Sequence, residues 1–500
     1  MSMNKLINGG RFDVRAFMKR RREEREEAAA VDMLEDAERK LPSQMRRPGS
    51  EWYYAHRASP KLSTWWVYTQ FGVHTDEAHA EGKKFRRRFR IPHTFYMHIL
   101  FTIRTDDDYV LLRQKGPDCT GRDPVPVELL VLGCFRVLGR HAEFDSLEEI
   151  TFISAESHRK YFHLFCEVWR RVVYPRVVRP PMTEAEVLEA MHDYTRAGFG
   201  GCFASMDCTH VAWSQCSGNL RNLATKGPIG HSTLAWELTV LHNRKIISCS
   251  PAFLGATHDA LILLWDDFPK KVAKGEFFPD MEYTLMDEEG EEKRYKGLWI
   301  LVDGGYPEWK TLIPPCKSPI DEDWMRWSKW AESLRKDVEC TINMLKGRWR
   351  ILKTGIRVHS KTHVENIFYT CVALHNQLLH LDGLDARWQE GIQRAWLGED
   401  GYFDADDVGA VFPAVNGAHR GMDLGGMGLG GGLDDRRLLV NQAAALAELE
   451  LAPRGTRSNF HLFRERLVVH FNYHFQRHNI VWPKRNKMLV KTDGTDIFNF

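Results

Sequence analysis

The sequence predicts an α/β fold in which an all-helical region precedes a mixed sheet with flanking helices. Residues 85–180 carry apolar side chains at helical spacing. From Gly201 onward, short apolar runs replace that spacing and alternate with amphipathic segments. The expected order is strand, strand, strand, helix, strand, helix, which is typical of a mixed α/β sheet.

The last part of the helical region resembles a helix-turn-helix. Two short expected helices are followed by a third, which begins at the capping residue Ser154. The same pattern also fits a small bundle that does no more than pack against the next domain. Both interpretations remain open from the sequence.

The sheet is expected to contain strands that lead directly into acidic residues. Residues 202–206 form an apolar run that ends at Asp207, and residues 295–302 run into Asp303. Residues 233–241 and 246–253 are further expected strands, and residues 283–286 are expected to pair with 295–302 as a hairpin. A buried strand that ends in an acid places a charge at the edge of the sheet, where ligands of α/β folds usually bind.

A third acid lies on a long amphipathic helix. Its apolar stripe recurs at steps of three and four residues, through Leu334, Val338, Ile342, Leu345 and Trp349. Glu339 lies one position past that stripe, on a polar face rich in cations. Three carboxylates from two strands and a helix would form an all-oxygen site, which Mg²⁺ or Mn²⁺ prefers. Such a site supports phosphodiester cleavage or transfer.

The basic residues are clustered, although the formal net charge is only +2. Lys and Arg are concentrated in residues 19–22, 83–90 and 335–357, which favours a polyanionic partner. The candidates for contact with phosphate are Arg335, Lys336, Lys346 and Arg348.

Ten cysteines without a regular framework, no signal-like segment and no apolar run of membrane-spanning length predict an intracellular protein with reduced thiols. The first basic run could serve in nuclear import. Zinc binding is disfavoured because one nearby set of thiols and a histidine fits no paired spacing. That set is Cys202, Cys208, His210 and Cys216.

Five short motifs occur in register over roughly residues 85–385. They are Ser205-Met206-Asp207-Cys208-Thr209-His210, Leu254-Gly255-Ala256-Thr257-His258-Asp259, Leu301-Val302-Asp303-Gly304-Gly305-Tyr306-Pro307, Arg335-Lys336-Asp337-Val338-Glu339 and Leu374-His375-Asn376. In these motifs the chain resembles the Harbinger-type DDE transposases, especially their plant transposon protein branch.

The resemblance implies a ribonuclease-H-like fold in which Asp207, Asp303 and Glu339 are the catalytic and metal-binding acids. Members of that family cut and rejoin DNA, often with a Myb-like helper protein that helps to recognise transposon ends. Cys340 and Asn343 depart from residues that the family often has beside the last acid.

The expected function is that of a nuclear DNA endonuclease or transposase that acts on double-stranded DNA. A homo-oligomer would be compatible with this function, and no association with a membrane is expected. The alternatives are a domesticated transposase that binds DNA or chromatin without cutting, and a nuclease that acts on RNA. His258 and Asp259 are candidate accessory groups, although Asp259 could equally cap a helix.

The expected domains are a charged leader, a helical DNA-binding region, a catalytic domain, a glycine-rich linker and a C-terminal helical tail. Their bounds are 1–84, 85–185, 200–385, 386–435 and 436–500. Two smaller features are interpreted as structural. His375 and Asn376 are expected to make buried hydrogen bonds. The tryptophans at 324, 327 and 330 are expected in a core, with base stacking as the alternative.

Overall fold

The computed structural model describes residues 58–113, 116, 124–227, 229–263, 265–319, 321–382 and 454–482. Near the N-terminus it also has an antiparallel pair of two-residue strands, β1 (Ile7–Asn8) and β2 (Arg11–Phe12). The chain divides into two units, Met1–Arg57 and Ala58–Phe500, and the architecture below is that of the second. The linker expected at 386–435 lies outside the described residues.

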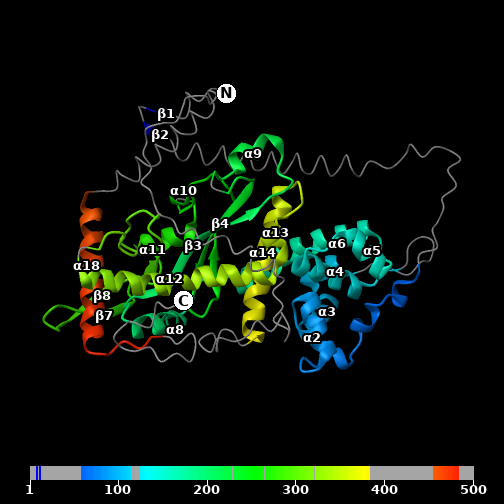
Figure 1. Ribbon diagram of the computed structural model, residues 1–500, viewed down its shortest axis with the longest axis horizontal. Coiled ribbons are helices and arrows are strands. Elements are labelled where there is room, and N and C mark those ends of the chain that lie inside the picture. The colour runs from blue at the N-terminus through cyan, green and yellow to red at the C-terminus, as the bar shows by residue number, and fades with distance from the viewer. Residues whose placement is uncertain are drawn as a thin grey trace. The chain divides into compact units, whose positions relative to one another are not determined.

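A mixed sheet forms the centre of this unit, as Figure 1 shows. Its strand order is β10-β9-β3-β4-β5, and β6 pairs with β4 beside β5. The β3–β4 and β4–β5 pairs are antiparallel, whereas β9 is parallel to both β3 and β10. This order is ribonuclease-H-like, so the predicted mixed α/β fold is confirmed. The strands are β3 (Cys202–Ala212), β4 (Thr233–Val240), β5 (Ile246–Cys249), β6 (Phe253–Leu254), β9 (Trp299–Leu301) and β10 (Leu312–Ile313).

Two expected strands are each split in the structure. Residues 246–253 give β5 and β6 because Pro251, which has no N–H to donate, interrupts them. The prediction of one continuous strand over residues 295–302 was wrong. Its first residues end β8 (Glu292–Lys296), which pairs with β7 (Glu282–Met286), and Gly297 with φ 90° redirects the chain into β9 of the main sheet.

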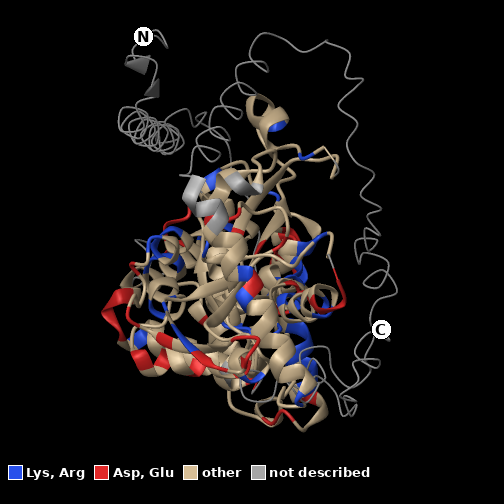
Figure 2. Cartoon of the chain, turned by 90° about the vertical axis from the view of Figure 1, so that its left-hand side faces the viewer, with Lys and Arg blue, Asp and Glu red and all other residues tan. Residues whose placement is uncertain are grey.

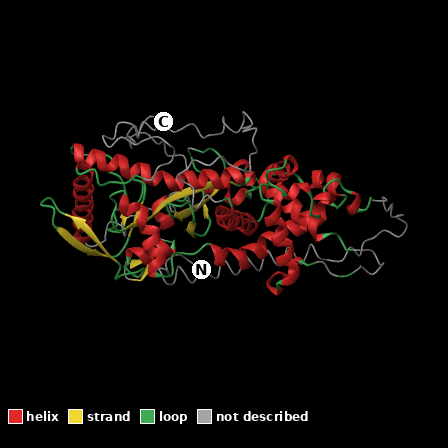
Figure 3. Ribbon diagram, turned by 90° about the horizontal axis from the view of Figure 1, so that it is seen from below, coloured by secondary structure: helices red, strands yellow, loops and turns green. Residues whose placement is uncertain are grey.

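Helices lie on both sides of the strands, as the view in Figure 3 shows. Helices α8 (Glu184–Arg196) and α12 (Glu322–Arg348) pack against β3, and α14 (Lys361–Leu381) contributes to the core beneath β4. The stripe predicted on α12 is buried, with Val338 fully enclosed. None of the described helices combines the length and apolarity that a membrane crossing requires.

The N-terminal helices share one hydrophobic core with the sheet and α14. Trp65 and Tyr68, which lie in the segment expected as a leader, are already buried in this core. Phe135 packs edge-on against Phe165, so neighbouring helices of the region interlock through aromatic rings. The helices are α2 (Ala80–Phe89), α3 (His93–Thr105), α4 (Val127–Arg140), α5 (Phe144–Thr151) and α6 (Ala155–Val168).

Helices α5 and α6 are joined by a tight turn, and Ser154 caps α6 by accepting a hydrogen bond from the Ser157 N–H at 3.2 Å. However, α6 packs against α4, α5 and α14. On its exposed side, Arg159 and Lys160 are ion-paired with Glu156 at 2.6 and 3.3 Å. The region packs as a bundle on the sheet domain, and Glu156 is shared by the two exposed cations of α6.

The C-terminal helix α18 (Arg454–Gln476) packs against α12 and β7 at the end of the sheet domain. Phe471 is fully buried, with its ring 5.4 Å from that of Phe199 and 5.5 Å from that of Trp330. Trp327 is also fully buried. Core packing is thus confirmed for Trp327 and Trp330, whereas Trp324 is half-buried against the same cluster. Helix α18, which lies in the tail predicted without a role, completes this core.

His375 and Asn376 make the buried hydrogen bonds that were predicted. The Asn376 side-chain amide accepts a hydrogen bond from the Ile246 N–H at 3.0 Å and donates one to the Ile246 carbonyl oxygen at 2.7 Å. Helix α14 is thereby attached to the first residue of β5. His375 Nε2 lies 3.1 Å from the Arg244 carbonyl oxygen. Both contacts hold the turn between β4 and β5.

Candidate functional site

Asp207 and Asp303 lie side by side at the edge of the β3–β9 pair. The parallel pairing ends with Ser205 opposite Leu301, and each acid is two residues further along its strand direction. Asp207 was expected at the end of a strand, but β3 continues to Ala212 along β4. The acid therefore lies within β3, at the point where the neighbouring strand β9 has ended.

Local hydrogen bonds orient both carboxylates. Asp207 Oδ1 accepts a hydrogen bond from the Cys208 N–H at 2.8 Å, and Asp303 Oδ1 accepts one from the Gly305 N–H at 2.6 Å. Asp303 thus begins a tight turn directly after β9. One oxygen of each carboxylate is thus engaged with backbone, and the second oxygen of Asp207 faces the Arg335 guanidinium.

Glu339 reaches the same place from α12. Asp321 caps that helix by accepting a hydrogen bond from the Trp324 N–H at 3.0 Å, and the apolar stripe through Val338 fixes its rotation on β3. Glu339 follows Val338 and so lies at the margin of the buried face, with 40% of its side chain exposed. Its carboxylate is accessible from solvent.

Arg335 joins the acids to one another. Its guanidinium lies 3.6 Å from Asp207, 2.6 Å from Glu339 and 2.7 Å from Glu332, and only 9% of its side chain is exposed. Burial disfavours its charge, but the acidic partners outweigh burial and raise the pKa of Arg335. Arg335 was predicted to contact phosphate, whereas in the structure it is the counterion of the acidic cluster.

The surroundings of Asp207 disfavour its ionised form. Burial raises the pKa of Asp207 to about 7; Arg335 opposes this rise, and the charges of Asp303 and Glu339 add to it. Lys346 lies close by, donating a hydrogen bond to the His210 carbonyl oxygen at 2.8 Å. Burial lowers the pKa of Lys346 to about 8, against the attraction of Cys208 and Asp207. A cation added to the cluster would relieve the repulsion among its acids.

We expect Asp207→Asn to stabilise the metal-free protein above neutral pH. A carboxyl whose folded pKa is raised contributes stability below its unfolded pKa and loses it as the pH rises through the folded value. The gain of the variant should therefore be absent near pH 3.8, grow up to about pH 7 and then level off. We expect it to reach about 1–2 kcal/mol, a discounted figure because the side chain keeps 23% exposure.

Thermal melts of wild type and Asp207→Asn in a chelating buffer, taken across this pH range, measure the difference. Asp280→Asn is a matched control, because that carboxylate is 90% exposed. A difference for Asp207→Asn that stays constant with pH, or a variant less stable than wild type at pH 8, would contradict the expectation.

The other predicted site residues lie at different distances from the acids. Lys336 is exposed on α12. Arg348 is 3% exposed and ion-paired with Asp382, so it is held inside the protein. His258 directly precedes α10 (Asp259–Leu263) and is exposed; its carbonyl oxygen accepts hydrogen bonds from the first turn. Asp259 is therefore the first residue of the helix.

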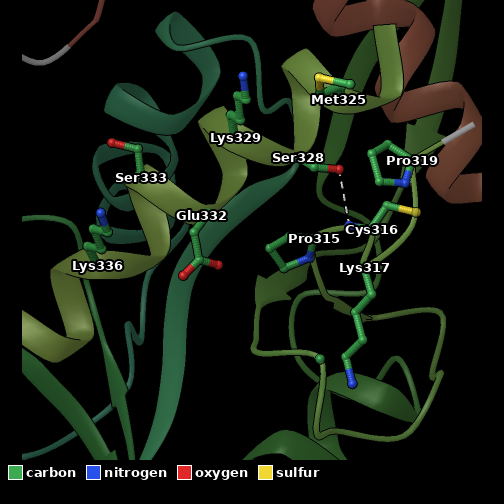
Figure 4. A pocket seen from close by; sticks show the side chains of 11 residues that line it. Pro315, Cys316, Lys317, Pro319, Met325, Ser328, Lys329, Glu332, Ser333 and Lys336 are labelled. Carbon is green, nitrogen blue, oxygen red and sulfur yellow. Dashed lines mark hydrogen bonds between the residues drawn. The ribbon is translucent and has the colours of Figure 1, made fainter. Parts of the chain in front are cut away.

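Sequence reasoning missed a pocket beside the acids, shown in Figure 4. It has a volume of about 490 Å³ and lies between α12 and the loop that follows β10. Glu332, which pairs with Arg335, lines it together with Gly304, the residue next to Asp303. The helical spacing from Arg335 could have indicated Glu332, whereas the approach of the distant loop has no signal in the sequence.

The carboxylates of Asp207, Asp303 and Glu339 offer the oxygen ligands that a hard divalent cation prefers. The side chains of Asp207 and Glu339 are both partly exposed. Within the described part of the chain, however, no three His, Cys, Asp or Glu side chains are grouped closely enough to ligate one ion. Arg335 lies between two of the acids. The residues fit such an ion in their chemistry, on condition that Arg335 gives up part of its contacts.

Residues 176–385 match the model of a family described as plant transposon protein. The matched region runs from the end of the helical region through α14, and it contains all three acids. The match supports a transposon-derived origin. Searches among curated proteins and among solved structures gave no match.

Proposed function

We propose that the chain is a divalent-metal-dependent DNA endonuclease or transposase of the Harbinger DDE type. The observation that carries the proposal is the juxtaposition of Asp207 and Asp303 where β9 ends, with Glu339 linked to the same place through Arg335. The family match over residues 176–385 supports a transposase-related function.

Asp207, Asp303 and Glu339 would hold Mg²⁺ or Mn²⁺. Such an ion, when bound, polarises an attacking oxygen and stabilises the leaving oxygen of a phosphodiester. The chain's own residues provide the setting: the Gly305 N–H fixes the direction of Asp303, and the half-buried Lys346 places a cation near Asp207. Arg335, once displaced from Glu339, would be free to contact a phosphate oxygen.

The proposed reaction is hydrolysis of a phosphodiester in double-stranded DNA at transposon ends. The freed 3′-hydroxyl then attacks a second phosphodiester, which joins the strand to target DNA and releases a hydroxyl from that target. We place this activity in the nucleus, with a Myb-like helper and self-association as expected features. In the view of Figure 2, both acidic and basic segments occur along the described chain.

The experiment is cleavage of plasmid and oligonucleotide DNA with Mg²⁺ or Mn²⁺ by wild type, Asp207→Asn, Asp303→Asn and Glu339→Gln. We expect metal-dependent cleavage by wild type and at least a hundredfold loss in each variant. Glu322→Gln is the matched control, because Glu322 lies on the same helix, is 86% exposed and pairs with Arg326 rather than with Arg335. It should cut within a few-fold of wild type.

A second function has one observation in its favour. Arg335 neutralises Asp207 and Glu339 within the protein, as it would in a domesticated transposase that binds DNA or chromatin without cutting. Wild type that binds DNA and never cuts it, even with a Myb-like partner and either metal, would establish this alternative instead.

A further inference from the structure

We propose that the pocket beside Asp303 binds one nucleotide of the DNA strand, adjacent to the phosphodiester that is cut. The proposal rests on the nuclease function proposed above, because it assigns a substrate subsite next to the same acids. It concerns the pocket between α12 and the loop after β10, whose volume of about 490 Å³ is within the range of small-ligand sites.

The pocket is lined by cations from two separate segments. Lys329 and Lys336 come from α12, and Lys317 comes from the loop after β10. All three are exposed. Glu332 is the acid among the lining residues, and it is bonded to Arg335 at 2.7 Å. The lining thus carries a net positive charge, which suits a phosphate group.

The wall of the pocket also has apolar parts. Pro315 and Pro319 of the loop face α12, where Met325 lies one helical turn before Lys329 (Figure 4). The loop is held to the helix by a hydrogen bond from the Cys316 N–H to Ser328 Oγ at 3.1 Å. Flat apolar side chains and a flexible thioether give a surface on which a base can pack. A cationic and apolar lining together favour a nucleotide over a free inorganic anion.

The pocket is continuous with the acidic cluster at two places. Gly304 follows Asp303 directly. The Lys317 side chain passes close to Gly304, because a Cβ added at Gly304 would lie 2.3 Å from Lys317 Cε. Along α12, Glu332, Lys336, Glu339 and Asn343 recur at steps of four, three and four residues and so share one helix face. A strand whose phosphodiester lies at the acids would therefore reach the pocket with its neighbouring nucleotide.

The test uses the full chain and a fluorescein-labelled single-stranded oligodeoxynucleotide, with binding followed by anisotropy at several salt concentrations. The variant is Lys317→Gln/Lys329→Gln/Lys336→Gln. Its matched control, Lys271→Gln/Lys274→Gln/Lys293→Gln, removes the same charge from exposed lysines outside the pocket. We expect the pocket variant to bind about tenfold or more weakly at 0.1 M salt and to lower the salt slope by about 2. The control should stay within about twofold of wild type.

Equal losses in the two triple variants would overturn the proposal, because binding would then follow overall charge alone. No loss in either would also overturn it, because the pocket lysines would then not contribute to binding. A second arm compares the oligonucleotide with one of equal length whose residues are abasic. Wild type should prefer the strand with bases, and Met325→Ala should reduce that preference. Equal binding of both strands by wild type would reject a nucleotide site.

Cleavage assays separate this inference from the proposed function. If wild type binds and never cuts, while the pocket variant loses binding, the subsite stands and the nuclease proposal fails. If wild type cuts and the pocket variant binds and cuts like it, the subsite fails alone. Asp303→Asn should bind the oligonucleotide like wild type and fail to cut it, provided that both proposals hold.

Discussion

Arg335→Ala is expected to lower the free energy of unfolding by about 3–5 kcal/mol in a chelating buffer. The guanidinium is 9% exposed and contacts Asp207, Glu332 and Glu339. Its removal leaves mutually repelling carboxylates without their counterion, in a place where burial already raises the pKa of Asp207. Thermal and urea melts with and without metal measure the loss.

Mg²⁺ should then restore much of the lost stability. In the variant the ion no longer competes with a guanidinium, so its binding should stabilise the fold by about 3 kcal/mol at a hundredfold excess over its dissociation constant. Wild type should gain less, because Arg335 must first be displaced. This measurement tests the acidic centre without any DNA.

Arg326→Ala is the matched control. Arg326 lies on the same helix, pairs with Glu322 and Asp323, and is 21% exposed, but those acids are remote from the β3–β9 edge. Its loss should cost less and should not respond to Mg²⁺. If Mg²⁺ shifted Arg335→Ala no more than wild type, the acids would not form a metal site.

The sequence indicated a set of acids but not the contacts that they make in the folded chain. Motifs and strand ends indicated Asp207, Asp303 and Glu339, and the parallel register then brought the first two to adjacent positions. Helical spacing placed Arg335 on the same helix face as Glu339, but spacing does not specify which group Arg335 contacts. Tertiary packing brings Asp207 of β3 within reach of its guanidinium.

Similar limits explain the strands and the tail. A run such as 295–302 has uniform apolar character, and its division at Gly297 depends on a backbone angle that glycine permits without requiring. In α18, apolar residues at helical spacing indicated a helix. Their partner, the aromatic cluster around Trp330, is distant in the sequence and became evident from packing.

The second large effect is expected at Asp382, which follows α14. Its carboxylate is 2% exposed and accepts hydrogen bonds from both Arg86 of α2 and Arg348 of α12. Three helices distant in the sequence are thus tied by one acid. Burial lowers the pKa of Arg348, and the charge of Asp382 acts against that shift. Without this carboxylate, two enclosed guanidinium groups would lose their shared counterion.

Asp382→Ala should therefore lower the free energy of unfolding by about 3–5 kcal/mol, measured by urea denaturation. Asp382→Asn should lose less, because the amide oxygen still accepts one hydrogen bond although the charge is gone. Asp267→Ala provides the comparison: that carboxylate is 89% exposed and pairs with Lys270, so its loss should cost less than about 1 kcal/mol. Equal costs for Asp382→Ala and Asp267→Ala would mean that the buried charges reorganise toward solvent. The attachment of α2 to the sheet domain would then depend on its apolar core, in which Phe85 and Phe89 are fully buried.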